Sequence, residues 1–117
     1  MSVSVVKQDE LPWSVIAREF VGAEYGGVGI CVIFVDAEPG RGPALHTHPY
    51  HELLIILEGQ ATLDDGNGKR EVQAGEIVLI PPGQPHGFVS SGEGRLRQID
   101  IHLSPSFSTD WLEKGES

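Results

Sequence analysis

Four side chains of the kinds that bind transition metals lie in two short stretches of the sequence. His46, His48 and Glu52 fall within seven residues, and His86 follows in a second stretch. Imidazole nitrogen and carboxylate oxygen together suit Fe, Mn, Ni, Co, Cu and Zn. Three histidines and one carboxylate can occupy one side of such an ion and leave positions open for a substrate. The residue types therefore predict one divalent transition metal per chain and leave its identity open.

The spacing of these residues favours a common direction. Residues two apart in a β-strand point to the same face, with Cα atoms about 6.5–7 Å apart, so His46 and His48 project together. Glu52 has the same parity and reaches the same interior if the chain turns a tight corner before it. His86 must come from another strand, and the proline-rich turn at 81–85 would aim it. Glu52 is also the candidate catalytic residue, because a carboxylate partly released from a metal can accept a proton.

The elements that must position these side chains are short strands. Fifteen glycines and eight prolines separate runs of aliphatic and β-branched residues, which is typical of an all-β sandwich or barrel. Strands are expected at 14–21, 29–36, 46–48, 52–57, 61–63, 71–73, 77–80, 87–90 and 96–103. The Asp-Gly-Asn-Gly sequence at 65–68 predicts a β-hairpin. The tail at 106–114 is expected to form a short helix with Ser108 as its N-cap and Trp111 closing one end of the barrel.

The two stretches resemble the two conserved motifs of the cupin superfamily. The first motif, residues 40–59, matches at Gly40, His46, His48, Glu52 and Gly59. The second, residues 75–90, matches at Gly75, Pro81, Gly83 and His86, with Ser90 where Asn is usual. The short spacing between them is similar to that of small single-domain cupins. The resemblance implies one domain over 1–117, a double-stranded β-helix (a jelly-roll-like barrel) with the metal near one mouth, bound by His46, His48, Glu52 and His86.

Other residues are candidates for contacts with a substrate. Gln98, Asp100 and His102 alternate with apolar residues, so this polar face lies either in the barrel cavity or in water. If it lies in the cavity, Gln98 and His102 contact the substrate. The candidates for the apolar wall, each of which could instead be core, are Tyr50, Phe34, Ile56 and Phe88. His51 has the opposite parity to the ligands and is expected at the surface or an interface.

The resemblance leaves the reaction open, because cupins include dioxygenases, isomerases, decarboxylases, storage proteins and sensor domains. The favoured hypothesis is a metal-dependent oxidoreductase of dioxygenase type that acts on a small organic molecule. Lewis-acid isomerisation or decarboxylation would use the same open positions without O₂. The alternative is a non-catalytic binding or sensor module, since residues 98–104 are similar to sugar-sensing domains of AraC-type regulators. A non-catalytic partner of a larger enzyme is a third hypothesis.

Composition and charge restrict the partners and the location. Seventeen acidic residues against eight basic ones give a formal charge of -9, which repels phosphate backbones, so no nucleic-acid partner is expected. No apolar run could span a bilayer and no signal peptide is recognisable, so no membrane partner is expected and the expected location is cytoplasmic. Cys31 is the single cysteine and is interpreted as a buried thiol.

Two of the expected strands predict a covered sheet. The runs 30–35 and 52–57 are apolar at both odd and even positions. A strand with one solvated face should instead alternate between apolar and polar residues. We therefore expect the outer face of this sheet to be covered, either by the N-terminal strand or by a second subunit, and we predict a homodimer.

Overall fold

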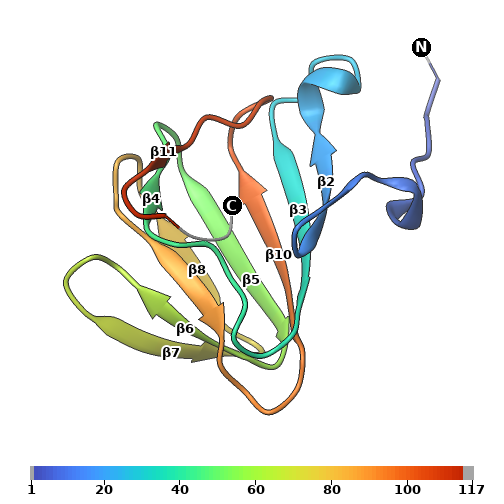
Figure 1. The fold of residues 1–117 in the computed structure, drawn as a ribbon. Coiled ribbons are helices and arrows are strands. Elements are labelled where there is room, and N and C mark those ends of the chain that lie inside the picture. Colours follow the sequence, from blue (N-terminus) through green and yellow to red (C-terminus); the bar gives the residue numbers. More distant parts are fainter. Residues whose placement is uncertain (1, 115–117) are drawn as a thin grey trace.

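A computed structural model describes residues 2–114 of the chain, which consist largely of β-strands (Figure 1). The strands are β1 (Trp13–Ser14), β2 (Ala17–Val21), β3 (Cys31–Ala37), β4 (His46–Thr47), β5 (Glu52–Glu58), β6 (Gln60–Asp64), β7 (Lys69–Gln73), β8 (Ile77–Ile80), β9 (Gly87–Ser90), β10 (Leu96–His102) and β11 (Asp110–Trp111). Two short 3₁₀ helices, Gln8–Glu10 and Gly22–Glu24, precede and follow the first hairpin. The predicted all-β class is confirmed.

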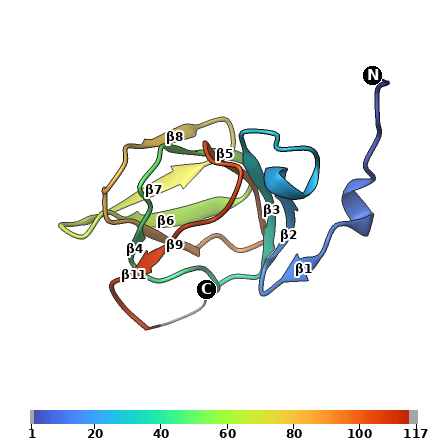
Figure 2. The ribbon, with the colours of Figure 1, turned by 90° about the horizontal axis from the view of Figure 1, so that it is seen from above.

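The strands form three antiparallel sheets that close around one interior. The largest has the order β1-β2-β3-β10-β5-β8, the second β7-β6-β9, and the third pairs β11 with β4. The six-stranded sheet curves around one side of the barrel and the three-stranded sheet lies opposite (Figure 2). Strands distant in sequence are neighbours, as in β3-β10-β5, and this arrangement is the predicted double-stranded β-helix.

The inward-facing residues change character along the two central strands. On β10, Leu96 is buried at one end, and the polar Gln98, Asp100 and His102 are buried after it. On β5, the inward positions run from Ile56 through Leu54 to Glu52 in the same direction, because Glu52 pairs with His102. The apolar end joins a core that includes Ala61, Val72 and Ile80 from the other strands. The barrel therefore has an apolar half and a polar half.

The expected strands are confirmed with small shifts at their ends. The first of them is divided, because Val15 has a φ of 54° and forms the turn of a hairpin between β1 and β2. The predicted hairpin at 65–68 joins β6 and β7. There, Oδ1 of Asp65 accepts the main-chain N–H groups of Asn67 and Gly68, each at 2.8 Å, and fixes the turn.

The predicted helix in the tail is wrong. The tail forms the short strand β11, whose two residues pair with Thr47 and His46 of β4. Ser108 does not act as an N-cap, because no helix follows it up to residue 114; its main-chain N–H and carbonyl groups bond to Tyr50 and His48. Tertiary hydrogen bonds thus override a weak local propensity. Trp111 comes from this strand rather than from a helix.

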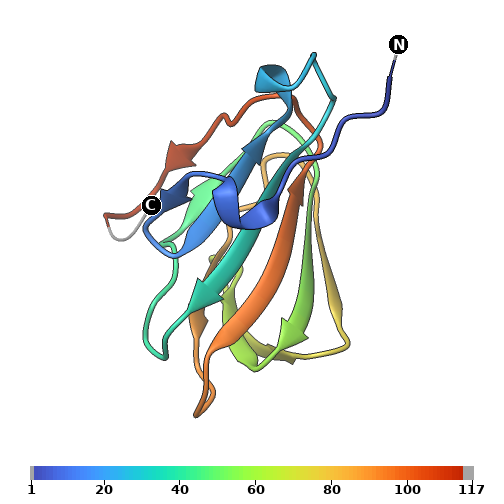
Figure 3. The ribbon, with the colours of Figure 1, turned by 90° about the vertical axis from the view of Figure 1, so that its right-hand side faces the viewer.

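The outer face of the large sheet is not covered by the N-terminal strands. β1 and β2 extend the sheet at its edge beside β3 (Figure 3). On the outer side of β5 and β8, Leu57, Ile77 and Leu79 are 51%, 61% and 73% exposed. A second subunit as the cover of this face stays a prediction. Within residues 2–114 there is no helix with the length and apolar character needed to span a membrane.

Candidate metal centre

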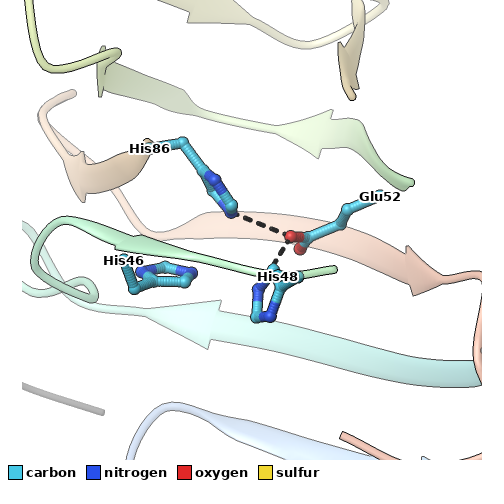
Figure 4. A group of neighbouring side chains, drawn as sticks. All are labelled: His46, His48, Glu52 and His86. Atoms are coloured by element: carbon cyan, nitrogen blue, oxygen red, sulfur yellow. Dashed lines mark hydrogen bonds and ion pairs between the residues drawn. The ribbon is translucent and has the colours of Figure 1, made fainter. Parts of the chain in front are cut away.

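Four buried side chains converge at the polar end of the barrel (Figure 4). His46 lies on β4, His48 just after it, Glu52 begins β5, and His86 directly precedes β9. Their nearest ligand atoms lie within 4.8 Å of one another. The two motifs meet because His46 and His86 exchange main-chain hydrogen bonds of 3.0 Å in both directions. The structure thus brings together all four of the residues that the sequence singled out as ligands.

The three imidazole rings are held in the same way. Each Nδ1 faces a main-chain carbonyl oxygen: Ala44 at 2.7 Å from His46, Ser108 at 2.8 Å from His48, and Gln84 at 2.9 Å from His86. A carbonyl can only accept, so Nδ1 carries the hydrogen atom in each ring. In the neutral ring, Nε2 then bears a free lone pair. This is the tautomer and the support that metal-binding histidines require.

Glu52 lies between these lone pairs. Its Oε1 is 2.9 Å from Nε2 of His86 and 3.2 Å from Nε2 of His48. The His48 nitrogen is near but poorly oriented, and none of the described residues gives it a hydrogen bond. A buried, unpaired nitrogen is unfavourable unless a further group satisfies it. A cation at the centre of the cluster would satisfy this nitrogen and the carboxylate together, so these residues fit a divalent metal ion.

The surroundings favour the metal-binding protonation state at His46 and Glu52 and oppose it at His48. Burial lowers the pKa of His46 to about 4, so this ring is neutral at pH 7. Burial would raise the pKa of Glu52, but its close contacts with the imidazoles of His102, His48 and His86 hold that pKa far below its usual range. Burial would also lower the pKa of His48, yet the Glu52 carboxylate and the Ser108 carbonyl outweigh it and raise that pKa. A metal ion would therefore compete with a proton at His48.

A cavity of about 240 Å³ opens beside the four residues. Its apolar wall is formed by Ile16, Ile33, Val35, Phe88, Phe107 and Trp111. Glu19, Asp100 and His102 add polar groups to the lining. A small, largely apolar molecule could lie here with one end against the cluster.

The other candidates from the sequence have different positions. Phe88 and His102 line the cavity, and Tyr50 lies beside it with its ring stacked on that of His48. Gln98 is buried outside the lining and donates to Oδ1 of Asp100 at 2.6 Å. The polar face of β10 therefore points into the barrel rather than into water. His51 is exposed, as its parity predicts.

Two of the apolar candidates do not line the cavity. Ile56 points inward but belongs to the apolar half of the barrel, too far along β5 from the cluster. Phe34 has the opposite parity to Ile33 and Val35, which face the cavity, so its side chain lies on the outer face near Trp13. Both residues lie on strands that border the cavity. Ile56 is too far along its strand to contact the cavity, and Phe34 is on the wrong face of its strand.

Some residues of the lining were not singled out from the sequence. Glu19 shares its parity with the buried Ala17 on β2, and this parity was the available signal. Phe107 and Thr109 had no such signal, because their positions depend on the pairing of β11 with β4.

Burial raises the pKa of Asp100 well above its ordinary value, and the negative charge of Glu52 adds to the shift. These two causes favour the protonated form of Asp100.

Comparison with known proteins shows the family of the domain that contains this site. A family model described as "Cupin domain" matches residues 33–102. The auxin-binding protein ABP19b of Prunus persica is 28% identical over 96 residues, which cover 77% of this chain and 45% of that protein. The chain spans about half the length of the curated relatives that it matches.

Two solved structures of similar fold carry activities in their descriptions. The polyketide cyclase RemF of Streptomyces resistomycificus superposes with a TM-score of 0.78 at 20% identity, over 98% of this chain and 89% of its own. Oxalate decarboxylase of Bacillus subtilis gives a TM-score of 0.80 at 22% identity, over 96% of this chain and 33% of its own. At these identities the similarity shows the fold alone.

Proposed function

The chain belongs to the cupin family, and we propose that it is a metal-dependent enzyme that oxidises a small organic molecule held in the barrel. One observation carries the proposal. Three imidazoles, each fixed through Nδ1, converge with one carboxylate at the wall of an apolar cavity. A purely structural site would be closed by its ligands, whereas this one has an open side.

The residues of the site would have different roles. His46, His48, Glu52 and His86 would hold the ion. A bound Fe, Mn, Ni or Cu ion would supply redox chemistry with O₂, while Co or Zn would act as a Lewis acid. The apolar wall would exclude water and orient the substrate toward the ligand cluster. Glu52 would accept a proton from the substrate, a contribution of about 10²–10⁴ in rate for a well-placed base.

The solved structures of similar fold favour a bound metal ion but do not favour one particular reaction. A further solved structure of the Bacillus subtilis oxalate decarboxylase concerns the Mn(II) centres of that enzyme. The described neighbours also include an oxalate oxidase and a polyketide cyclase. Manganese is therefore among the ions to test first, and the substrate has to be found by experiment.

The test is reconstitution of the metal-free protein. The protein is loaded separately with Fe(II), Mn(II), Ni(II) or Cu(II), and O₂ consumption is measured with a panel of phenols, enols and keto acids. We expect consumption with at least one pair of ion and substrate, and none with His48→Ala. Turnover of a keto acid without O₂ would replace oxidation by Lewis-acid chemistry at the same site.

A binding module is the second candidate, favoured by the name of one relative, an auxin-binding protein. In this case the metal and the apolar wall would hold a small molecule without converting it. A binder would show thermal stabilisation by its ligand, about 2.7 kcal/mol at a hundredfold excess over Kd, with no turnover. Turnover in the first experiment would exclude this candidate.

We also propose that the chain forms a homodimer through the outer face of β5 and β8. Leu57, Ile77 and Leu79 form an exposed apolar patch, which a twofold axis would pair with its own copy. Light scattering should give twice the chain mass of 12.6 kDa, and Leu79→Lys should give a monomer. A monomeric native protein would refute this assembly. A cytoplasmic location also stays a prediction.

A further inference from the structure

We propose that His102 and Tyr50 are positioning residues, which hold Glu52 in the orientation that the metal centre requires. The inference rests on the proposed metal centre and adds two residues to it. Neither residue belongs to the group of four whose ligand atoms converge. Both lie between that group and the C-terminal segment of the chain.

Both nitrogen atoms of His102 are engaged. Nε2 is 3.1 Å from Oε2 of Glu52, and Nδ1 is 2.7 Å from the hydroxyl oxygen of Tyr50. His102 is 3% exposed, so water does not compete for these contacts. The ring packs nearly perpendicular to that of Phe107, with an interplanar angle of 81° and centroids 5.0 Å apart. The ring is therefore fixed in position and in orientation.

The hydrogen bonds run in one direction along this chain of groups. Oε2 of the ionised Glu52 can only accept, so Nε2 of His102 donates to it. In the neutral ring, Nδ1 then accepts the hydroxyl hydrogen of Tyr50. The Tyr50 oxygen in turn accepts the main-chain N–H of Ser108 at 3.3 Å.

The consequence for Glu52 is a division of its two oxygen atoms. Oε2 is held by His102 and Oε1 is left facing His86 and His48. Without the first bond the carboxylate could rotate about its terminal torsion, which is broad and weakly restricted. Supports of this kind typically change metal affinity or activity 10–100-fold when they are removed. The role also differs from the substrate contact that we expected for His102, because its polar atoms are already used.

The experiment uses Co(II) as a spectroscopic probe with the full-length protein. Three variants separate the contributions: His102→Leu removes both polar contacts, His102→Gln keeps an N–H donor near the position of Nε2, and Tyr50→Phe removes only the hydroxyl group. His51→Gln is the matched control, because it changes an exposed histidine next to Glu52 in sequence. Co(II) affinity is measured by competition with a chelator, and the d–d absorption bands report the coordination geometry.

We expect His102→Leu to weaken Co(II) binding about 10–100-fold and to change the d–d bands. His102→Gln should restore most of the affinity, Tyr50→Phe should show a smaller loss, and the control should match the native protein. Native affinity and native bands in both His102→Leu and Tyr50→Phe would overturn this inference alone. If the native protein binds neither Co(II) nor another divalent ion, the proposed function itself fails. Circular dichroism identifies a variant that has not folded, in which case His102→Gln and Tyr50→Phe decide.

Discussion

The two halves of the barrel interior are buried to a similar degree and differ in chemistry. In the apolar half, Leu54, Ile56 and Leu96 are at most 2% exposed and pack against other aliphatic side chains. In the polar half, the four clustered residues are 3–5% exposed, together with Asp100 and His102. The same strands, β5 and β10, contribute to both halves.

The comparison separates the residues that stabilise the fold from the residues that form the candidate metal site. Burial of apolar surface contributes about 25 cal/mol per Å² to stability. Burial of imidazole and carboxyl groups opposes folding unless they are paired or bound to a cation. The apolar half should therefore carry the stability of the metal-free protein, and the polar half should depend on its ligand. The following experiments test that division.

The largest effect is expected from His48→Ala. This change removes one of the three imidazoles proposed as ligands, including the buried nitrogen that has no partner among the described residues. We expect the metal content, measured by elemental analysis after reconstitution, to fall from about one ion per chain to background. The metal-free variant should still unfold cooperatively. Full metal content in the variant would place the ion elsewhere, and His51→Ala serves as the control.

Leu54→Ala should show the opposite behaviour. Leu54 is 1% exposed in the apolar half, so its truncation leaves a cavity and should lower the free energy of unfolding by about 2–5 kcal/mol. Urea denaturation of the metal-free protein measures this loss. The affinity of the folded variant for metal should stay native. A large loss of affinity would show that the two halves are coupled rather than separate.

Removal of the metal should destabilise the native protein by a smaller amount. An ion present at a hundredfold excess over its Kd stabilises the folded state by about 2.7 kcal/mol. Thermal melts with and without a chelator should differ accordingly for the native chain. The same melts should coincide for His48→Ala. Equal melts for the native chain would mean that the polar half is stable without an ion.

Asp100→Asn should stabilise the metal-free protein, with an effect that depends on pH. The folded-state pKa of Asp100 lies above its unfolded value, so its favourable contribution is complete below about 3.8 and is lost as pH rises through the folded-state value. The asparagine variant avoids this loss and can still accept the hydrogen bond from Gln98. We expect a gain of about 0.5–2 kcal/mol at neutral or higher pH, and less in acid. A gain that is independent of pH would contradict this explanation.

The smallest effect is expected from Trp111→Ala. Trp111 is 44% exposed, and its ring centroid lies 4.8 Å from that of His46. Loss of this contact should cost about 0.5–1.5 kcal/mol in stability. Metal affinity should change less than in His48→Ala, because the main-chain support of His46 by Ala44 remains. A loss of metal as complete as that of His48→Ala would make the tail an essential part of the centre.

The convergence of the four candidate ligands could be predicted because most of its signals are local. His46 and His48 are two residues apart, and Glu52 shares their parity, so one strand and one corner place them together. His86 followed from the second motif, and the hairpin at 65–68 from its turn residues. The same reasoning placed His51 outside.

Other features could not be read in this way. The sequence allowed both the cavity and the solvent for the polar face of β10, and only the pairing of β10 between β3 and β5 turns that face inward. The tail suggested a helix because its local pattern permits one. Its actual partners are Thr47 and His46 of β4, which are more than sixty residues away in the chain.

The sequence by itself determined the strands and the four clustered residues, because glycine and proline punctuation, parity and motif spacing act over short distances. The resemblance of the two motifs to cupins added the barrel. The tertiary structure decided what surrounds them. It places His102 beside Glu52 and Tyr50 beside His102. It also brings the Ser108 carbonyl to His48 and places Phe34 outside the cavity. These contacts join segments that are distant in the chain, so they exist only once the whole barrel has closed.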